Sequence, residues 1–152
     1  MTPCIVIPFY NHQGTIAKLL DLLKPLDLPC ILVNDGSSVE ASAVVQELNK
    51  KHTWLTLVEL PENRGKGGAV CAGFREAHQQ GFTHALQIDA DLQHQIDDIP
   101  KFITMGQKHP EKIILGKPVY DESVPKGRLY GRYITHFFVW LETLSFSIKD
   151  SM

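Results

Sequence analysis

The stretch Cys30-Ile31-Leu32-Val33-Asn34-Asp35-Gly36-Ser37 decides the fold. Its first four residues are apolar, which is typical of a strand that is buried on both faces. Asn34-Asp35-Gly36 is typical of a turn and ends this strand. A helical pattern follows over residues 39–51, and Ser37 and Glu40 have the spacing of a capping box at its start. The stretch therefore predicts a strand, a turn and a helix in succession.

The same succession recurs on both sides of this stretch. Short apolar runs predict strands over residues 4–8, 30–33, 55–60, 85–88 and 113–115. Amphipathic runs predict helices over residues 16–23, 39–51, 66–80 and 99–108. Strands that alternate with helices pair in parallel, and the helices then cover both faces of the sheet. We expect one α/β domain over residues 1–152, with a doubly wound, mostly parallel sheet in a Rossmann-like three-layer sandwich.

The composition is that of an ordinary globular protein. The chain has 152 residues, of which 43% are hydrophobic and 21% charged, so it can bury a core without disulfides. A net charge of -2 gives no general attraction to nucleic acid, and we expect no such partner. No long apolar run or basic leader is visible, which favours a cytoplasmic protein. Cys4, Cys30 and Cys71 stand in apolar stretches, and we expect them to act as small hydrophobic residues in a reducing compartment.

Ligands of doubly wound sheets bind at the carboxyl ends of the strands, so the residues after each strand matter most. Asp89-Ala90-Asp91-Leu92-Gln93-His94 follows the fourth apolar run. Two carboxylates are hard oxygen ligands that suit Mg²⁺ or Mn²⁺ bridging to phosphate oxygens, and Gln93 offers a neutral oxygen. The alternative is a solvated loop that caps the next helix.

Two further polar segments follow strands. In Asn34-Asp35-Gly36-Ser37, Asp35 is placed to accept hydrogen bonds from a base or ribose, and the alternative is a plain turn with a helix cap. In Asn63-Arg64-Gly65-Lys66-Gly67-Gly68, the glycines let the backbone approach a phosphate while Arg64 and Lys66 add charge. The alternative is a glycine-rich helix start. The segment matches neither a Walker P-loop nor a Rossmann fingerprint.

Taken together, the segments point to a family. The chain resembles family 2 glycosyltransferases with the GT-A fold, and within them the dolichyl-phosphate mannose synthase-like branch, over roughly residues 3–120. The segments that carry the resemblance stand in the family's order and spacing. They are Ile7-Pro8-Phe9-Tyr10-Asn11, Val33-Asn34-Asp35-Gly36-Ser37-Ser38, Asn63-Arg64-Gly65-Lys66-Gly67 and Ile88-Asp89-Ala90-Asp91-Leu92-Gln93-His94.

The resemblance implies roles on the donor side. It implies that Asp89 and Asp91 hold Mg²⁺ or Mn²⁺ on a sugar-nucleotide diphosphate with Gln93 as an auxiliary ligand, and that Asp91 is catalytic. Asn34 stands where the family often has an aspartate, which changes one hydrogen bond of the pocket. The other residues implied to bind the donor are Pro8, Tyr10, Asn11, Asp35, Arg64, Lys66 and Ala90.

On the acceptor side, Lys117 stands where the family often has an arginine, and Arg128 and Arg132 stand where the branch has basic residues near an acceptor phosphate. Asp150 is the candidate general base, and its alternative is a surface aspartate. The aromatic-rich residues 128–148 predict a helix. That helix is either an interfacial helix in peripheral contact with the inner face of a membrane, or a core or homodimer-contact helix.

The expected activity is inverting transfer of a sugar from a UDP- or GDP-sugar to a lipid phosphate, such as a polyprenyl phosphate, or to a glycan. One alternative is a non-catalytic nucleotide-binding fragment of a larger transferase. Another is a phosphotransferase with Asp89 as nucleophile, which the position of the motif after the fourth strand disfavours. The chain ends where the resemblance expects an acceptor-side segment, so we expect that part to be missing.

Overall fold

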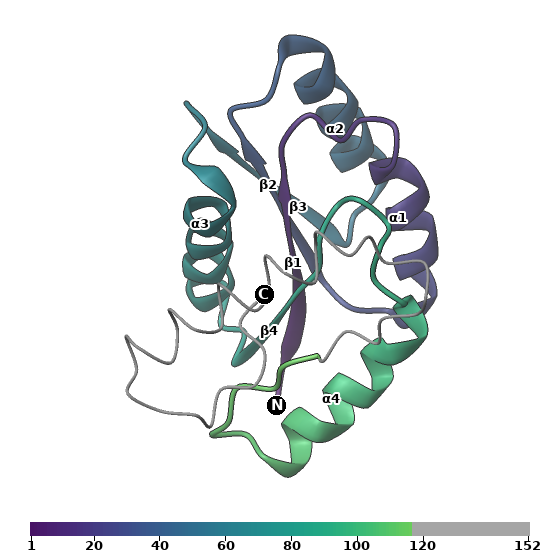
Figure 1. Ribbon diagram of the computed structural model, residues 1–152, viewed down its shortest axis with the longest axis vertical. Helices are drawn as coiled ribbons and strands as arrows, with labels where there is room; N and C mark the ends of the chain where they lie inside the picture. Colours follow the sequence, from purple (N-terminus) through teal and green to yellow (C-terminus); the bar gives the residue numbers. More distant parts are fainter. Residues whose placement is uncertain (117–152) are drawn as a thin grey trace, which may run out of the picture. The chain divides into compact units, whose positions relative to one another are not determined.

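The computed structural model describes residues 1–116, and a parallel sheet forms the centre of the unit over residues 1–114 (Figure 1). Within these residues, the sheet has four strands in the order β3-β2-β1-β4. They are β1 (Pro3–Phe9), β2 (Cys30–Asp35), β3 (Leu55–Leu60) and β4 (His84–Gln87). The register aligns Ile5 with both Cys30 of β2 and Leu86 of β4. The strand order runs outward in both directions from between β1 and β4, as in a doubly wound fold.

Helices alternate with the strands. They are α1 (Ile16–Leu23), α2 (Val39–Lys51), α3 (Gly65–Gln79) and α4 (Ile99–Lys108), with short 3₁₀ turns η1 (Lys24–Leu26) and η2 (Ile96–Asp98). The predicted helices and the first four predicted strands are thus confirmed to within one or two residues at their ends.

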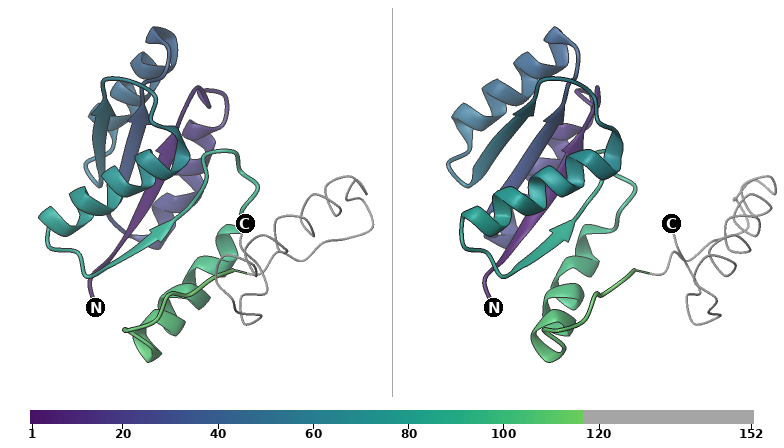
Figure 2. Two further views of the ribbon diagram at one scale, coloured as in Figure 1. Left: turned by 60° about the vertical axis from the view of Figure 1, so that its left-hand side comes forward. Right: turned by 90° about the vertical axis from the view of Figure 1, so that its left-hand side faces the viewer.

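The helices cover both faces of the sheet and complete three layers (Figure 2). On one face, α1, α2 and α4 bury residues such as Leu19, Val45 and Ile99 against the inward side of β1 and β2. On the other face, α3 buries Ala69 and Ala77. Side chains of β1 and β2 therefore contact a core on both faces, which explains why these strands are apolar without alternation.

Helix α3 lies unusually close to the sheet. A Cβ atom built on Gly73 would lie 2.4 Å from Cγ1 of Val6 in β1. Ala69, Gly73 and Ala77 are spaced four apart and form the buried face of the helix. Cys71 lies on the opposite side and is exposed, so the expectation that it packs as a core residue is wrong, whereas Cys4 is buried as expected.

Two local predictions are also wrong. The N-cap of α2 is Ser38, whose hydroxyl accepts a hydrogen bond from the Ala41 N–H at 3.3 Å. Ser37 is not the cap because its hydroxyl accepts a hydrogen bond from the Asn11 N–H instead. Residues 113–115 form no strand, and Ile113 is 88% exposed, because this short run pairs with none of the described strands.

Among residues 1–116, no helix combines the length and the apolar character that crossing a membrane requires.

Candidate functional site

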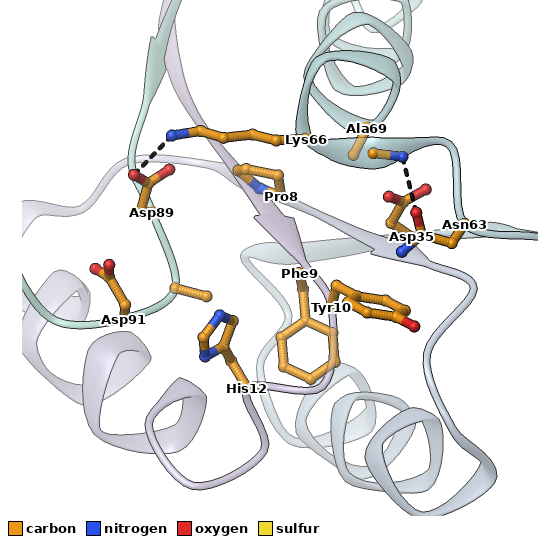
Figure 3. A pocket seen from close by; sticks show the side chains of 12 residues that line it. Pro8, Phe9, Tyr10, His12, Asp35, Asn63, Lys66, Ala69, Asp89 and Asp91 are labelled. Carbon is orange, nitrogen blue, oxygen red and sulfur yellow. Dashed lines mark hydrogen bonds and ion pairs between the residues drawn. The ribbon is translucent and has the colours of Figure 1, made fainter. Parts of the chain in front are cut away.

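A cavity of about 360 Å³ opens at the carboxyl ends of β1, β2 and β4 (Figure 3). This size lies within the range of small-molecule sites. Asp35 lies on one side of the cavity, and Asp89 and Asp91 lie on the other. The cavity is lined by Pro8, Phe9, Tyr10, His12, Asp35, Asn63, Gly65, Lys66, Ala69, Asp89, Ala90 and Asp91.

Asp35 is fixed at the end of β2 by the loop that precedes α3. Its carboxylate is buried, with 2% of the residue exposed, and Oδ1 accepts a hydrogen bond from the Arg64 N–H at 2.8 Å. The next residue, Gly36, has a φ of 63°, and a Cβ there would lie 2.5 Å from the Asn63 nitrogen. Only glycine allows this contact, so Gly36 lets the loop containing Asn63 and Arg64 lie against Asp35.

Asn34 faces away from the cavity. Its Nδ2 donates a hydrogen bond to the Ser42 hydroxyl in α2 at 2.9 Å, and its Oδ1 accepts one from the Ser37 N–H at 3.3 Å. The residue is 3% exposed and does not line the cavity. Asn34 therefore fixes the turn after β2 to α2, a role that needs both the donor and the acceptor of an amide.

Asn11 connects two loops at the same edge of the sheet. Its N–H donates to the Ser37 hydroxyl at 3.1 Å, and its Oδ1 accepts from the Ser38 N–H at 2.9 Å. Its φ of 56° lies in the left-handed region, which asparagine tolerates better than most residues. Asn11 does not line the cavity, so in this structure it holds the loops beside the cavity in place.

Asp89 is the centre of a group of polar side chains. Its Oδ2 lies 2.8 Å from Lys66 Nζ and 3.3 Å from His94 Nε2, and its Oδ1 accepts a hydrogen bond from Gln87 Nε2 at 2.7 Å. Burial raises the pKa of this carboxyl, but the hydrogen bond and charge of Lys66, joined by those of His94, outweigh burial and hold the pKa below its usual value. Asp89 is therefore an anion at neutral pH.

Asp91 stands two residues further along the same loop and also lines the cavity. Its Oδ1 accepts a hydrogen bond from the Gln93 N–H at 3.0 Å across Leu92, which has a φ of 64°. The Thr15 hydroxyl donates to the Ala90 carbonyl oxygen at 2.6 Å. The loop is thus held at its centre while its two carboxylates lie beside the same cavity.

The donor set suits a cation that is shared with a phosphate. Within residues 1–116, no three histidine, cysteine, aspartate or glutamate side chains are grouped closely enough to hold a metal ion. Mg²⁺ in phosphate sites is typically bound by one or two carboxylates, with water and substrate oxygens completing the shell. Asp89 and Asp91 fit this kind of shared site, and they do not form a protein cage around an ion.

The cavity brings together many of the residues selected from the sequence: Pro8, Tyr10, Asp35, Lys66, Asp89, Ala90 and Asp91. Arg64 contributes its backbone N–H to Asp35, and Gln93 is exposed; neither lines the cavity. Lys117, Arg128, Arg132, Asp150 and the helix predicted over 128–148 lie outside the described residues.

Some residues that line the cavity are not among those predicted from the sequence: Phe9, His12, Asn63, Gly65 and Ala69. Phe9, Asn63 and Gly65 stand inside the selected segments, so position in a motif was a usable signal for them. Ala69 lies one helical turn after Lys66, and helical spacing would have placed it on the same side. His12 follows the end of β1 by a few residues, and nothing in the sequence marks its side chain as facing the cavity.

Comparison with known proteins identifies the family. The model of the glycosyl transferase family 2 matches residues 4–150 of the chain. The chain belongs to glycosyl transferase family 2. The predicted fold class is confirmed as well, because a mannosyltransferase of Pyrobaculum calidifontis, solved in complex with GDP-Man and Mn²⁺, matches with a TM-score of 0.53 and 28% identity. That match covers 59% of this chain and 27% of the other.

Two relatives of the chain have names that contain a dolichyl or dolichol phosphate. A UDP-N-acetylglucosamine–dolichyl-phosphate N-acetylglucosaminyltransferase of Methanococcus voltae is 30% identical over 90% of this chain and 61% of its own length. A dolichol-phosphate mannosyltransferase of Pyrococcus furiosus is 31% identical over 85% of this chain and 40% of its own length. The resemblance to the dolichyl-phosphate mannose synthase-like branch is thereby confirmed. The chain spans less than two thirds of the length of either relative.

Proposed function

We propose that this chain binds a nucleoside diphosphate sugar in the cavity and transfers the sugar, with inversion, to a polyprenyl phosphate. One observation carries the proposal. A buried carboxylate, Asp35, and a pair of carboxylates, Asp89 and Asp91, line the same cavity from two sides. A nucleoside diphosphate has hydrogen-bond donors at one end and a metal-binding diphosphate at the other, so its two ends match the two sides of the cavity.

The nucleoside is assigned to the side of Asp35. Its carboxylate is already oriented by the Arg64 N–H, which leaves it ordered to accept hydrogen bonds from a ribose hydroxyl or a base. Tyr10 is 48% exposed at the rim of this side and offers a ring against which a base can pack. The sequence order of these residues is that of the family's nucleoside pocket, which supports the assignment.

The diphosphate is assigned to the side of Asp89 and Asp91. The N-terminus of α3 begins here with Gly65 and Lys66, and helix N-termini favour anions through their free N–H groups and dipole. Asp89 and Asp91 would hold Mg²⁺ or Mn²⁺, and Gln93 is proposed as an auxiliary ligand. An ion held there would neutralise the negative charge that develops on the departing diphosphate.

The reaction that we propose is a direct displacement. A phosphate oxygen of the acceptor forms a bond to the anomeric carbon while the bond from that carbon to the diphosphate oxygen breaks, and the nucleoside diphosphate leaves. A lipid phosphate is already anionic near neutral pH and needs no general base, whereas a glycan hydroxyl needs one. This chemistry and the names of the relatives favour the lipid phosphate, and a lipid acceptor supports peripheral contact with a membrane.

Thermal unfolding with a panel of UDP-, GDP- and dTDP-sugars, each with and without Mn²⁺, tests donor binding. A donor at a hundred times its Kd raises the free energy of unfolding by about 2.7 kcal/mol. For a chain of this size, this corresponds to a rise in Tm of about 5 °C or more. Asp91→Ala is expected to lose the part of this rise that depends on Mn²⁺. The control Asp97→Asn changes an exposed aspartate outside the cavity and is expected to keep it.

No rise in Tm with any donor, or an undiminished rise in Asp91→Ala, would refute the proposal. A second assay follows transfer of a labelled sugar from the best donor to a polyprenyl phosphate or to a glycan. Donor binding without transfer to either acceptor would favour the non-catalytic nucleotide-binding alternative.

A further inference from the structure

We propose that Lys66 is an internal competitor of the divalent cation at Asp89, and that a nucleoside diphosphate relieves this competition by offering Lys66 other oxygens. Metal and nucleotide then bind cooperatively, and the metal alone binds weakly. The inference rests on the proposed function, because it assigns a diphosphate and a divalent cation to the same cavity. It concerns the order and coupling of binding, which neither the fold nor the family determines.

The two aspartates differ in how far they are already paired. Asp89 has both carboxylate oxygens engaged: the Lys66 ammonium lies 2.8 Å and His94 Nε2 3.3 Å from Oδ2, and the Gln87 amide lies 2.7 Å from Oδ1. Of these partners, Lys66 carries the permanent positive charge. Asp91 accepts a hydrogen bond from the Gln93 backbone N–H and from no side chain within residues 1–116. A cation that binds both aspartates therefore competes with side-chain partners at Asp89 and, among the described residues, with none at Asp91.

The competition at Asp89 is electrostatic as well as steric. A divalent ion binds a carboxylate oxygen at about 2.0–2.1 Å in the case of Mg²⁺. Lys66 Nζ lies 2.8 Å from Oδ2, so an ion on that oxygen would share it with the ammonium, and the two positive charges would repel each other at close range. The ammonium therefore opposes binding of the ion at Oδ2.

Lys66 has the freedom and the place to move. Its side chain is 61% exposed, against 27% for Asp89, and it reaches Asp89 from the first turn of α3 across the cavity (Figure 3). Its four-carbon stem lets the ammonium reorient without a change in the backbone. A diphosphate bound at the start of α3 would give the ammonium new oxygens close to its present position. The nucleotide would then remove the competitor and supply ligands to the ion in a single event.

Cooperativity of this kind is reciprocal, so it can be measured from the metal side. Lys66→Met keeps an unbranched side chain that is shorter by one atom, and removes the ammonium. We expect it to bind Mn²⁺ alone about fivefold more tightly than the wild type, at the lower end of ordinary coupling factors. The factor by which UDP or GDP improves Mn²⁺ binding is expected to shrink by a similar amount. Lys66→Arg keeps the charge and the contact and is expected to behave like the wild type.

The matched control is Arg75→Met, which removes one positive charge from an exposed position further along α3; Arg75 does not line the cavity, and it forms no ion pair among the described residues. We expect it to change Mn²⁺ binding less than twofold. Free Mn²⁺ is titrated by electron paramagnetic resonance with each variant, alone and with UDP or GDP, and circular dichroism checks the fold.

Equal or weaker binding of Mn²⁺ alone by Lys66→Met overturns the inference, and so does an equal gain in Arg75→Met. If neither the wild type nor Lys66→Met binds Mn²⁺ measurably, the inference also fails; if only Lys66→Met binds it, the inference is supported. The arm without nucleotide decides this question separately from the proposed function, which fails instead if no nucleotide sugar binds to the wild type with or without Mn²⁺.

Discussion

The Thr15 hydroxyl donates a hydrogen bond of 2.6 Å to the carbonyl oxygen of Ala90, which stands between Asp89 and Asp91. Thr15 immediately precedes α1, and its hydroxyl also lies 3.1 Å from the His12 carbonyl oxygen. One side chain thus connects the loop after β1 with the loop after β4. The backbone of the aspartate loop is held in place from outside the loop, by a residue that does not line the cavity.

This contact makes Thr15 a positioning residue whose removal can be tested. Thr15→Val keeps the shape of the side chain and loses the hydroxyl, at a cost of about 0.5–1.5 kcal/mol in the free energy of unfolding. We expect donor affinity in Mn²⁺ to fall about fivefold, since about 1 kcal/mol corresponds to that factor. Affinity without metal should change little. Calorimetric titration checks both values, and Thr15→Ser should restore the first; an equal loss with and without metal would contradict the assignment.

For Asp35 we expect a loss of affinity that does not depend on the metal, in contrast to Thr15. Asp35→Ala removes the acceptor of the Arg64 N–H from a buried position, and an unpaired buried donor costs about 1–3 kcal/mol in the free energy of unfolding. Because Asp35 is assigned to the nucleoside, the loss of nucleotide affinity should be the same with Mn²⁺ and with a chelator. Urea denaturation and nucleotide titration measure the two effects. Asp21→Ala, on the exposed surface of α1, serves as the control and should leave both unchanged.

Much of the fold could be predicted because β1 and β2 are buried on both faces. A strand of this kind must be apolar throughout, so the run Cys30-Ile31-Leu32-Val33 clearly predicts a buried strand. The run at residues 113–115 is equally apolar, yet it forms no strand. Apolar character alone does not provide a partner strand, and pairing depends on residues distant in the sequence.

The site could be predicted in part for a related reason. The carboxyl ends of parallel strands lie at one edge of the sheet, so the sequence predicts that Asp35 and Asp89 lie at the same edge. The roles of Asn11 and Asn34 could not be predicted, because their side chains bond to Ser38 and Ser42 in a neighbouring loop and helix. Which of several nearby polar groups an amide will choose is decided by packing, and the sequence pattern does not record it.

The cysteines differ in reactivity. In the native protein we expect a disulfide reagent to label one thiol rapidly, that of Cys71, which is exposed. Burial raises the pKa of the Cys4 thiol to about 11, and burial likewise raises the pKa of Cys30, so neither forms the reactive thiolate near pH 8. Both should react only after unfolding. Cys71→Ser should show no rapid reaction, and rapid labelling of a second thiol in the wild type would contradict the buried positions.

The raised pKa of the Cys4 thiol also predicts that the free energy of unfolding falls at alkaline pH. A thiol whose pKa is higher in the folded state stabilises that state while it is protonated, below its ordinary value of 9.0. This contribution is lost as the pH rises from 9.0 toward about 11. Cys4→Ala should therefore lose less of its free energy of unfolding over this interval than the wild type does. Urea denaturation at a series of pH values measures the difference. If the free energy of unfolding falls equally in both proteins, the burial of Cys4 is not the cause of the pH dependence.

The contact between α3 and β1 depends on the absence of a side chain at Gly73. A Cβ there would lie 2.4 Å from Val6 Cγ1 and 3.1 Å from Val33 Cγ2, so Gly73→Ala forces the helix away from both strands. Overpacking of this kind costs about 1–3 kcal/mol in the free energy of unfolding. Gly67 lies in the same helix with no atom within 4 Å of its Cβ position, so Gly67→Ala should be neutral or stabilising by up to about 1 kcal/mol. Urea denaturation compares the two variants. A stabilising Gly73→Ala would mean that α3 does not lie as close to the sheet as the structure places it.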